Sequence, residues 1–220
     1  MKKRTAVVTG GTRGIGRGIC ELLKEEGYDV VAGYAGNEEA AARFSEETGI
    51  ETHKWDVSDF NACQEAIESI SASHGNPTIL VNNAGITRDG TLKRMSYDDW
   101  MSVIQTNLTS VFNMCKGTWS HMVEENFGRI VNISSVNGQA GQYGQVNYCA
   151  AKAGVIGMTK ALAQEGSRFN ITANTVAPGY VATDMVAAVP ENILEKIVAT
   201  IPVGRLGDAS EIARAVWFLC

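Results

Sequence analysis

Short β-branched and apolar runs alternate with helix-like segments along most of this chain. Alternation of this kind predicts parallel strands joined by right-handed helical crossovers. The expected fold is therefore α/β, with a doubly wound parallel sheet flanked by helices. The predicted strands are residues 4–8, 29–32, 52–57, 78–81, 129–133 and 172–176, and the predicted helices include 14–27, 38–47, 61–73 and 96–125.

The length and the net charge of the chain indicate one domain and disfavour nucleic acid and membranes as partners. No change in composition divides the 220 residues, so one domain spanning 1–220 is expected. A net charge of −5 gives no general affinity for nucleic acid or for an anionic membrane. No apolar run approaches the roughly 20 residues of a membrane helix, and the apolar run near the start stops after Val8, too short for a secretory signal.

The cysteines and histidines point away from disulfide and metal chemistry. Five cysteines are scattered through the chain without a Cys-x-x-Cys pair. Reduced thiols in a cytoplasmic protein are the expected state. The three histidines, His53, His74 and His121, are far apart in sequence and lack ligand-like spacing, so no metal site is expected.

Small or polar residues follow nearly every predicted strand. Ligands of doubly wound sheets bind beyond the carboxyl ends of the strands, and those ends meet along one edge. A ligand site is therefore expected at this edge. The segments that would form it are Thr9-Gly10, Asp56-Val57, Asn82 to Gly85, Ser134-Ser135 and Ala177-Pro178-Gly179.

Three glycines join the first strand to the first helix. Gly10, Gly14 and Gly16 lack side chains that would keep a pyrophosphate from the backbone N–H groups, and the helix N-terminus favours negative charge. Glycines also punctuate ordinary turns, so the pattern gains weight from its place in the first strand–turn–helix unit. The position indicates a Rossmann-type site for a dinucleotide.

The end of the second strand bears on the choice of dinucleotide. An NAD-binding chain usually places Asp or Glu there, about 20 residues beyond the glycine loop. Here residues 32–37 contain no carboxylate, and Arg13 offers a cation to a 2′-phosphate. These features favour NADPH, although Arg13 also fits a solvated loop position.

A phenol and an amine lie one helical turn apart near the fifth strand. Tyr148 and Lys152 are at positions i and i+4 and so share a helix face, and Ser135 stands thirteen residues before Tyr148. A nearby ammonium and the positive charge of the nicotinamide are together expected to lower the pKa of the phenol from about 10. Tyr148 would protonate the oxygen of a ketone as hydride reaches its carbon, and Ser135 would hold that oxygen.

These motifs, in this order, resemble those of the short-chain dehydrogenase/reductase family from about Lys3 to Cys220. The resemblance implies that Asn107 sits at a break in the long helix and holds a water that relays protons to Lys152. It also implies that Lys152 contacts the nicotinamide ribose. The implied catalytic residues are Asn107, Ser135, Tyr148 and Lys152, and the implied cofactor contacts, besides Tyr148 and Lys152, are Gly10, Thr12, Arg13, Gly14, Ile15, Gly16, Asp56, Val57, Asn83, Ala84, Gly85, Pro178, Gly179, Val181 and Thr183.

Residues 141–148 resemble those of family members that reduce acetoacetyl-CoA to (R)-3-hydroxybutyryl-CoA for polyhydroxybutyrate synthesis. Enzymes that reduce 3-oxoacyl groups on acyl carrier protein are the alternative, but Glu124 and Glu125 would repel that acidic carrier. A non-catalytic NADPH-binding sensor is an alternative of another class. A sugar-nucleotide epimerase would need a longer substrate domain. The expected substrate contacts are Arg88, Ser135, Gln142, Tyr143, Gln145 and Tyr180, with Gln139, Lys93 and Arg94 nearby.

The resemblance also implies a lid and an assembly. The amphipathic segment between Pro190 and Pro202 corresponds to a lid over the substrate. A homotetramer built through the 96–125 and 148–166 helices is expected. The chain ends within an apolar helical run, whereas family members continue into another strand, so the last strand of the family is expected to be missing.

Overall fold

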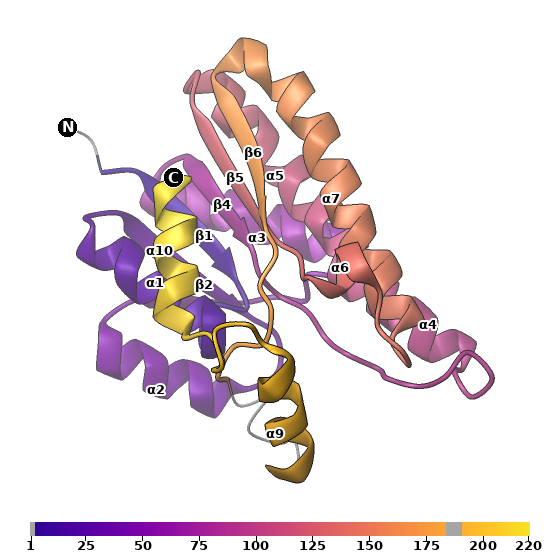
Figure 1. Ribbon diagram of the computed structural model, residues 1–220. Coiled ribbons are helices and arrows are strands. Elements are labelled where there is room, and N and C mark those ends of the chain that lie inside the picture. Colours follow the sequence, from indigo (N-terminus) through magenta and orange to yellow (C-terminus); the bar gives the residue numbers. More distant parts are fainter. Residues whose placement is uncertain (1–2, 184–190) are drawn as a thin grey trace.

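Six parallel strands form the central sheet of the computed structural model, which describes residues 3–183 and 191–220 (Figure 1). Their spatial order is β3-β2-β1-β4-β5-β6, so the chain winds outward from β1 in both directions. The predicted doubly wound parallel sheet is confirmed. The strands are β1 (Thr5–Thr9), β2 (Asp29–Tyr34), β3 (Glu51–Lys54), β4 (Pro77–Asn82), β5 (Gly128–Ile133) and β6 (Ile171–Val176).

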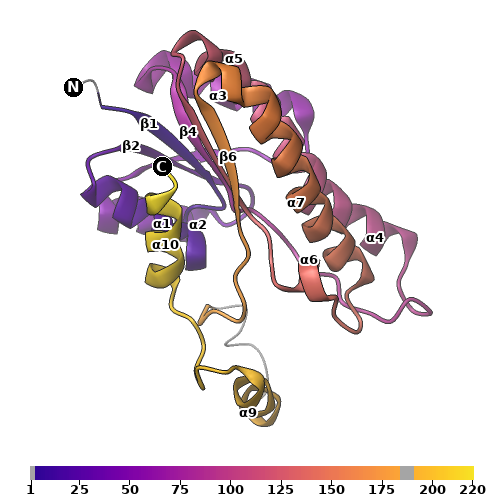
Figure 2. The ribbon, with the colours of Figure 1, turned by 45° about the horizontal axis from the view of Figure 1, so that its top comes forward.

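Helices cover both faces of the sheet, giving three layers (Figure 2). One face carries α1 (Gly14–Glu25), α2 (Glu38–Thr48) and α10 (Ala209–Phe218). The other face carries α3 (Phe60–His74), α4 (Tyr97–Ile104), α5 (Ser110–Glu124) and α7 (Val146–Gly166). The remaining elements are the π-helix η1 (Gln105–Thr109), α6 (Asn137–Ala140), the 3-10 helix η2 (Ser167–Phe169) and α9 (Glu191–Thr200).

Two apolar clusters form the core, one on each face of the sheet. Successive residues of a strand point to opposite faces, so Ala6 and Val8 belong to the cluster under α1 and α10, whereas Val7 belongs to the cluster under α3, α5 and α7. All five residues of β1 are buried. Burial on both faces fixes the strand ends that carry the site.

Two predicted elements differ from those observed. The strand expected to reach Val57 ends at Lys54, because Lys54 pairs with Tyr34, the last residue of β2. The helix expected over 96–125 consists of α4, η1 and α5. Thus Asn107 lies in a π-helical turn, which confirms the predicted break in that helix.

The histidines depart from the sequence-based expectation. His53 and His74, which are far apart in sequence, both contact the Glu51 carboxylate. The folded chain therefore brings together two histidines that the sequence separates by a whole helix. All five cysteines are free thiols. Within the described ranges, no helix combines the length and apolar character that a membrane crossing requires.

Candidate active site

The carboxyl ends of β1 and β4 are joined directly. The Thr9 hydroxyl accepts hydrogen bonds from the backbone N–H groups of Asn83 and Ala84, at 3.0 and 3.1 Å. The Asn83 side-chain amide donates to the carbonyl oxygens of Thr9 and Gly10, both at 3.0 Å. The predicted cofactor residue Asn83 therefore holds the two strand ends in a fixed relation through its side chain.

The glycine loop requires its glycines for two different reasons. Gly10 and Gly14 adopt positive φ angles of 62° and 52°, which residues with a Cβ rarely adopt. At Gly16 a Cβ would lie 2.1 Å from the Gly10 carbonyl oxygen. The first turn of α1 therefore packs directly on the loop, and the backbone at Gly16 carries no side chain.

The groups around the loop fit a dinucleotide with a 2′-phosphate. Helix α1 begins without a side-chain cap, so its first N–H groups can face an anion. Residues 34–37 at the end of β2 contain no carboxylate, and Glu38 is paired with Lys54. Arg13 is exposed and forms no ion pair with any residue in 3–183 or 191–220 that the structure records.

The other predicted cofactor residues follow the neighbouring strands. Pro178 is buried and its carbonyl accepts from the Val136 N–H at 3.0 Å, beside Ser135. Thr183 approaches the glycine loop, since a Cβ on Gly14 would lie 3.4 Å from its methyl group. Asp56 accepts from the N–H and hydroxyl of Ser58, at 2.8 and 2.7 Å. Pro178 and Thr183 thus lie near Ser135 and the glycine loop, and the other predicted cofactor residues follow strands along the chain: Thr12, Ile15, Val57, Gly85, Gly179 and Val181.

Ser135, Tyr148 and Lys152 converge where β5 meets α7. The Lys152 Nζ lies 5.7 Å from the centroid of the Tyr148 ring and donates a 2.7 Å hydrogen bond to the Ile133 carbonyl. Ser135 is buried, and its hydroxyl accepts from the Asn137 N–H at 3.2 Å. The predicted grouping of a hydroxyl, a phenol and an amine is therefore present in three dimensions.

Burial governs the protonation of the phenol and the amine. Desolvation raises the pKa of Tyr148, and the adjacent Ser135 hydroxyl partly opposes that effect. The expected lowering depends on the ammonium and the nicotinamide's charge together, so the raised pKa describes the phenol before the cofactor's charge acts on it. Desolvation also lowers the pKa of Lys152 to about 8. A phenol with a raised pKa keeps its proton at neutral pH, as a proton donor requires.

The Asn107 side chain forms hydrogen bonds with the segment that follows β4. Its Oδ1 accepts from the Ile86 N–H and its Nδ2 donates to the Ile86 carbonyl, both at 2.8 Å. A Cβ on Gly85 would lie 3.3 Å from Asn107 Oδ1 and 3.7 Å from Lys152 Nζ. Asn107 therefore borders the lysine, and its amide positions the chain that passes between them.

Several supporting contacts at the site were not predicted from the sequence. The buried amide of Asn82 donates to Asn132 Oδ1 at 2.8 Å, and Asn132 donates to the Thr159 hydroxyl at 2.9 Å. The Ser134 hydroxyl donates to the Lys152 carbonyl at 2.8 Å. Asparagines inside apolar strand sequence were the available signal, since a buried amide requires partners.

Most of the predicted substrate residues are exposed, but one forms hydrogen bonds within the protein. Tyr143 is 86% exposed, and Gln142 and Arg88 are also exposed. Gln145 is engaged instead: its Oε1 accepts from Asn137 and its Nε2 donates to Asp89, at 2.9 and 2.8 Å. Gln145 therefore fixes the loop around the site rather than presenting a free amide.

The two loops that flank Tyr148 are tied together. The Gly90 N–H donates to the Gly144 carbonyl at 2.8 Å. The buried Asn147 donates to the Arg88 carbonyl at 2.9 Å, and its Oδ1 accepts from the Tyr148 N–H. We call residues 88–90 and 141–145 the paired loops. They form one wall beside the phenol.

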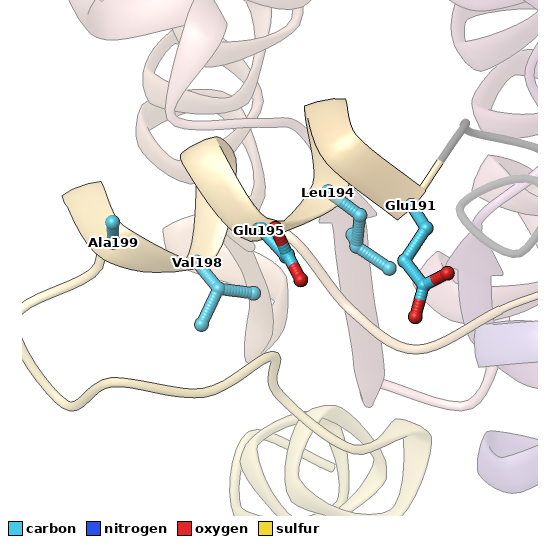
Figure 3. Close-up of a pocket in the computed structure, with 5 residues that line it drawn as sticks. All are labelled: Glu191, Leu194, Glu195, Val198 and Ala199. Atoms are coloured by element: carbon cyan, nitrogen blue, oxygen red, sulfur yellow. The ribbon is translucent and has the colours of Figure 1, made fainter.

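A hollow of about 430 Å³ lies along α9, apart from the predicted catalytic residues. The lining residues that the structure describes, drawn in Figure 3, all belong to this helix. The predicted amphipathic segment is thus helical over Glu191–Thr200, while residues 184–190 and the Ile193 side chain lie outside the described part. Tyr180, at the base of this segment, accepts from the Gly207 N–H through its carbonyl at 2.9 Å. The hollow is lined by Glu191, Leu194, Glu195, Val198 and Ala199.

Comparison with known proteins agrees with this geometry. The model of the short chain dehydrogenase family matches residues 4–194. The chain is 58% identical to an acetoacetyl-CoA reductase of Rhizobium meliloti (strain 1021), over 98% of this chain and 90% of that protein. It is 46% identical to a 3-oxoacyl-[acyl-carrier-protein] reductase of Haemophilus influenzae, over 100% of this chain and 91% of that protein.

The chain belongs to the short-chain dehydrogenase family, as the sequence motifs predicted. It is an oxidoreductase on a Rossmann-type fold and uses a nicotinamide cofactor. Another relative, 48% identical over 97% of this chain and 89% of that protein, is the acetoacetyl-CoA reductase of Cupriavidus necator.

Proposed function

We propose that this chain is an NADPH-dependent acetoacetyl-CoA reductase that forms (R)-3-hydroxybutyryl-CoA, a polyhydroxybutyrate precursor. The convergence of Ser135, Tyr148 and Lys152 beside the glycine loop supports ketone reduction. The names of relatives that are 48–58% identical over nearly the whole chain support the acyl-CoA substrate.

The residues at the sheet edge define the proposed chemistry. The glycine loop would hold the pyrophosphate of the dinucleotide, whose reduced nicotinamide would supply the hydride for the keto carbon. Tyr148 donates the proton to the keto oxygen, and the buried Ser135 hydroxyl holds that oxygen by a hydrogen bond. Lys152 retains two donor positions besides its bond to Ile133, and these are available to the cofactor ribose and to the phenolate left after proton transfer.

Arg13 is the proposed source of the preference for NADPH. It is exposed beside the start of α1, and the nearest acid after β2, Glu38, is neutralised by Lys54. A 2′-phosphate would therefore meet a cation without facing a free carboxylate.

Free CoA is favoured over a carrier protein because of the charges near the site. Arg88, Lys93 and Arg94 are exposed in the segment after β4 and suit the phosphates of CoA. Glu124 and Glu125, before β5, are exposed and would repel an acidic carrier protein. The α9 helix, with its apolar hollow, is the proposed lid over the acyl group.

A homotetramer in the cytoplasm is the proposed state of the enzyme. Phe60 and Phe112, on α3 and α5, stack at 6.4 Å between ring centroids while remaining 42% and 51% exposed. Such an exposed aromatic pair suits burial between subunits. Light scattering should give a mass near four chains, and a stable monomer would contradict this assembly.

The decisive experiment measures NADPH oxidation by the purified enzyme with three substrates. Acetoacetyl-CoA should give the highest kcat/KM, ahead of acetoacetyl-acyl carrier protein and longer 3-oxoacyl-CoA esters. A preference for the carrier protein would instead assign the chain to fatty acid synthesis. Absence of turnover with every substrate, together with intact NADPH binding, would indicate a sensor.

A further inference from the structure

A cluster of two histidines and two carboxylates lies at the edge of the sheet opposite the catalytic residues. Glu51 begins β3, Asp29 begins β2 and His74 ends α3, whereas the catalytic residues follow the carboxyl ends of the strands. The donor atoms of Glu51, His53 and His74 all lie within 4.8 Å of one another. The cluster takes no part in the proposed reduction.

The contacts within the cluster converge on Glu51. Its Oε1 lies 2.8 Å from His53 Nε2, and its Oε2 lies 3.0 Å from His74 Nε2. Donor atoms around a tetrahedral zinc ion are about 3.3 Å apart, given bonds of 2.0–2.1 Å to nitrogen and oxygen. Because the donor atoms of the three residues lie within 4.8 Å of one another, shifts of at most about 1.5 Å between these side chains would admit the ion.

The second ring nitrogen of His74 is already held. Its Nδ1 lies 2.9 Å from Asp29 Oδ2. A carboxylate at the far nitrogen of a histidine ligand is a recurrent feature of zinc sites, because it fixes the orientation and tautomer of the ring. The His74 backbone carbonyl is also fixed, since it accepts from the Thr5 hydroxyl at 2.7 Å.

The geometry around His74 suits a ligand with a fixed ring. Each ring nitrogen of His74 faces a carboxylate oxygen, Nδ1 that of Asp29 and Nε2 that of Glu51. A metal ion between Nε2 and Glu51 would take the lone pair of Nε2, and Nδ1–H would then donate to Asp29.

We propose that Glu51, His53 and His74 form a zinc site, with Asp29 orienting His74. Two imidazoles and one carboxylate are a ligand set that suits Zn²⁺, and the partial exposure of Glu51 leaves a fourth position for water. Because the ligands come from the edge strand β3 and from α3, bound zinc would fasten that strand to the helix. This role is independent of the proposed reduction.

The test is zinc titration calorimetry on tag-free protein, beside thermal unfolding with and without zinc. The wild-type chain should bind one zinc ion, and its melting temperature should rise by about 5–10 °C at a free zinc concentration one hundred times Kd. His74→Ala and Glu51→Gln should each weaken binding more than about 100-fold, and Asp29→Asn about 10–100-fold.

His121→Gln is the matched control, because His121 lies on α5 and contacts Asn76 instead of the cluster. This variant should bind zinc like the wild type. Cobalt substitution should give visible bands without sulfur-to-cobalt charge transfer, since the cluster contains no thiol. Absence of zinc binding by the wild type, survival of binding in His74→Ala, or a thiolate signature would each overturn the proposal.

Discussion

Lys152 donates its 2.7 Å hydrogen bond to the carbonyl of Ile133, the last residue of β5. The bond ties the ammonium to the strand end that leads into Ser135. A second hydrogen bond runs in the other direction, because the Ser134 hydroxyl donates to the Lys152 carbonyl. Strand and helix therefore set the positions of the hydroxyl and the amine together.

Replacing Tyr148 by Phe tests the proton donor. Loss of a positioned acid should reduce kcat by about 10²–10⁴-fold, while NADPH affinity measured by fluorescence titration should fall much less, because the phenol is only one of many implied cofactor contacts. Tyr97→Phe is the control, because Tyr97 is 75% exposed on α4. Turnover within a few-fold of the wild type in Tyr148→Phe would remove the phenol from the mechanism.

Replacing Lys152 by Met tests how much the buried amine lowers the free energy of unfolding. The pKa of Lys152 falls from 10.5 to about 8 on burial, so the unfolded chain binds more protons than the folded chain between these values. Wild-type stability should therefore rise with pH, by about 2 kcal/mol between pH 8 and 9.5, relative to Lys152→Met.

Urea unfolding at several pH values measures this difference. Below pH 8 the variant, which carries no buried charge, should be the more stable protein, although it should lose activity. Lys160→Met, at an exposed position of the same helix, should show no such trend. A gap between Lys152→Met and wild type that stays constant with pH would contradict the expectation.

Replacing Gly16 by Ala tests the close packing of α1 on the glycine loop. The new Cβ would lie 2.1 Å from the Gly10 carbonyl oxygen, so the loop must move. We expect a loss of about 1–3 kcal/mol in stability and weaker NADPH binding. Gly157→Ala, where no atom lies within 4 Å of the new Cβ, should instead gain about 0.5–1 kcal/mol. Thermal unfolding distinguishes these opposite signs.

Replacing Arg13 by Ser tests the choice of cofactor. Removing a charge-assisted hydrogen bond of about 1.5–3 kcal/mol should weaken NADPH binding by roughly 10–100-fold and leave NADH binding nearly unchanged. Arg168→Ser, after α7, is the control for loss of a surface arginine. Equal weakening of NADPH and NADH would show that Arg13 acts on the loop rather than on the phosphate.

The element order and the parallel sheet could be predicted because local patterns carry them, whereas the break at Asn107 was implied by the resemblance to the family. Burial raises the pKa of Tyr148, and the sequence displays the nearby lysine but not this desolvation. The contacts between Asn82, Asn132 and Thr159 join residues from two strands and a helix, and no local pattern records them. The same holds for His53 and His74, which meet only through folding.

The engagement of Gln145 has a consequence for redesigning the enzyme. Its contacts with Asn137 and Asp89, together with the hydrogen bond from Gly90 to Gly144, hold the paired loops to each other. A chimera that imports residues 141–145 from a relative would keep these contacts only if residue 89 still accepts from residue 145. Two pieces of sequence more than fifty residues apart would therefore have to be exchanged together.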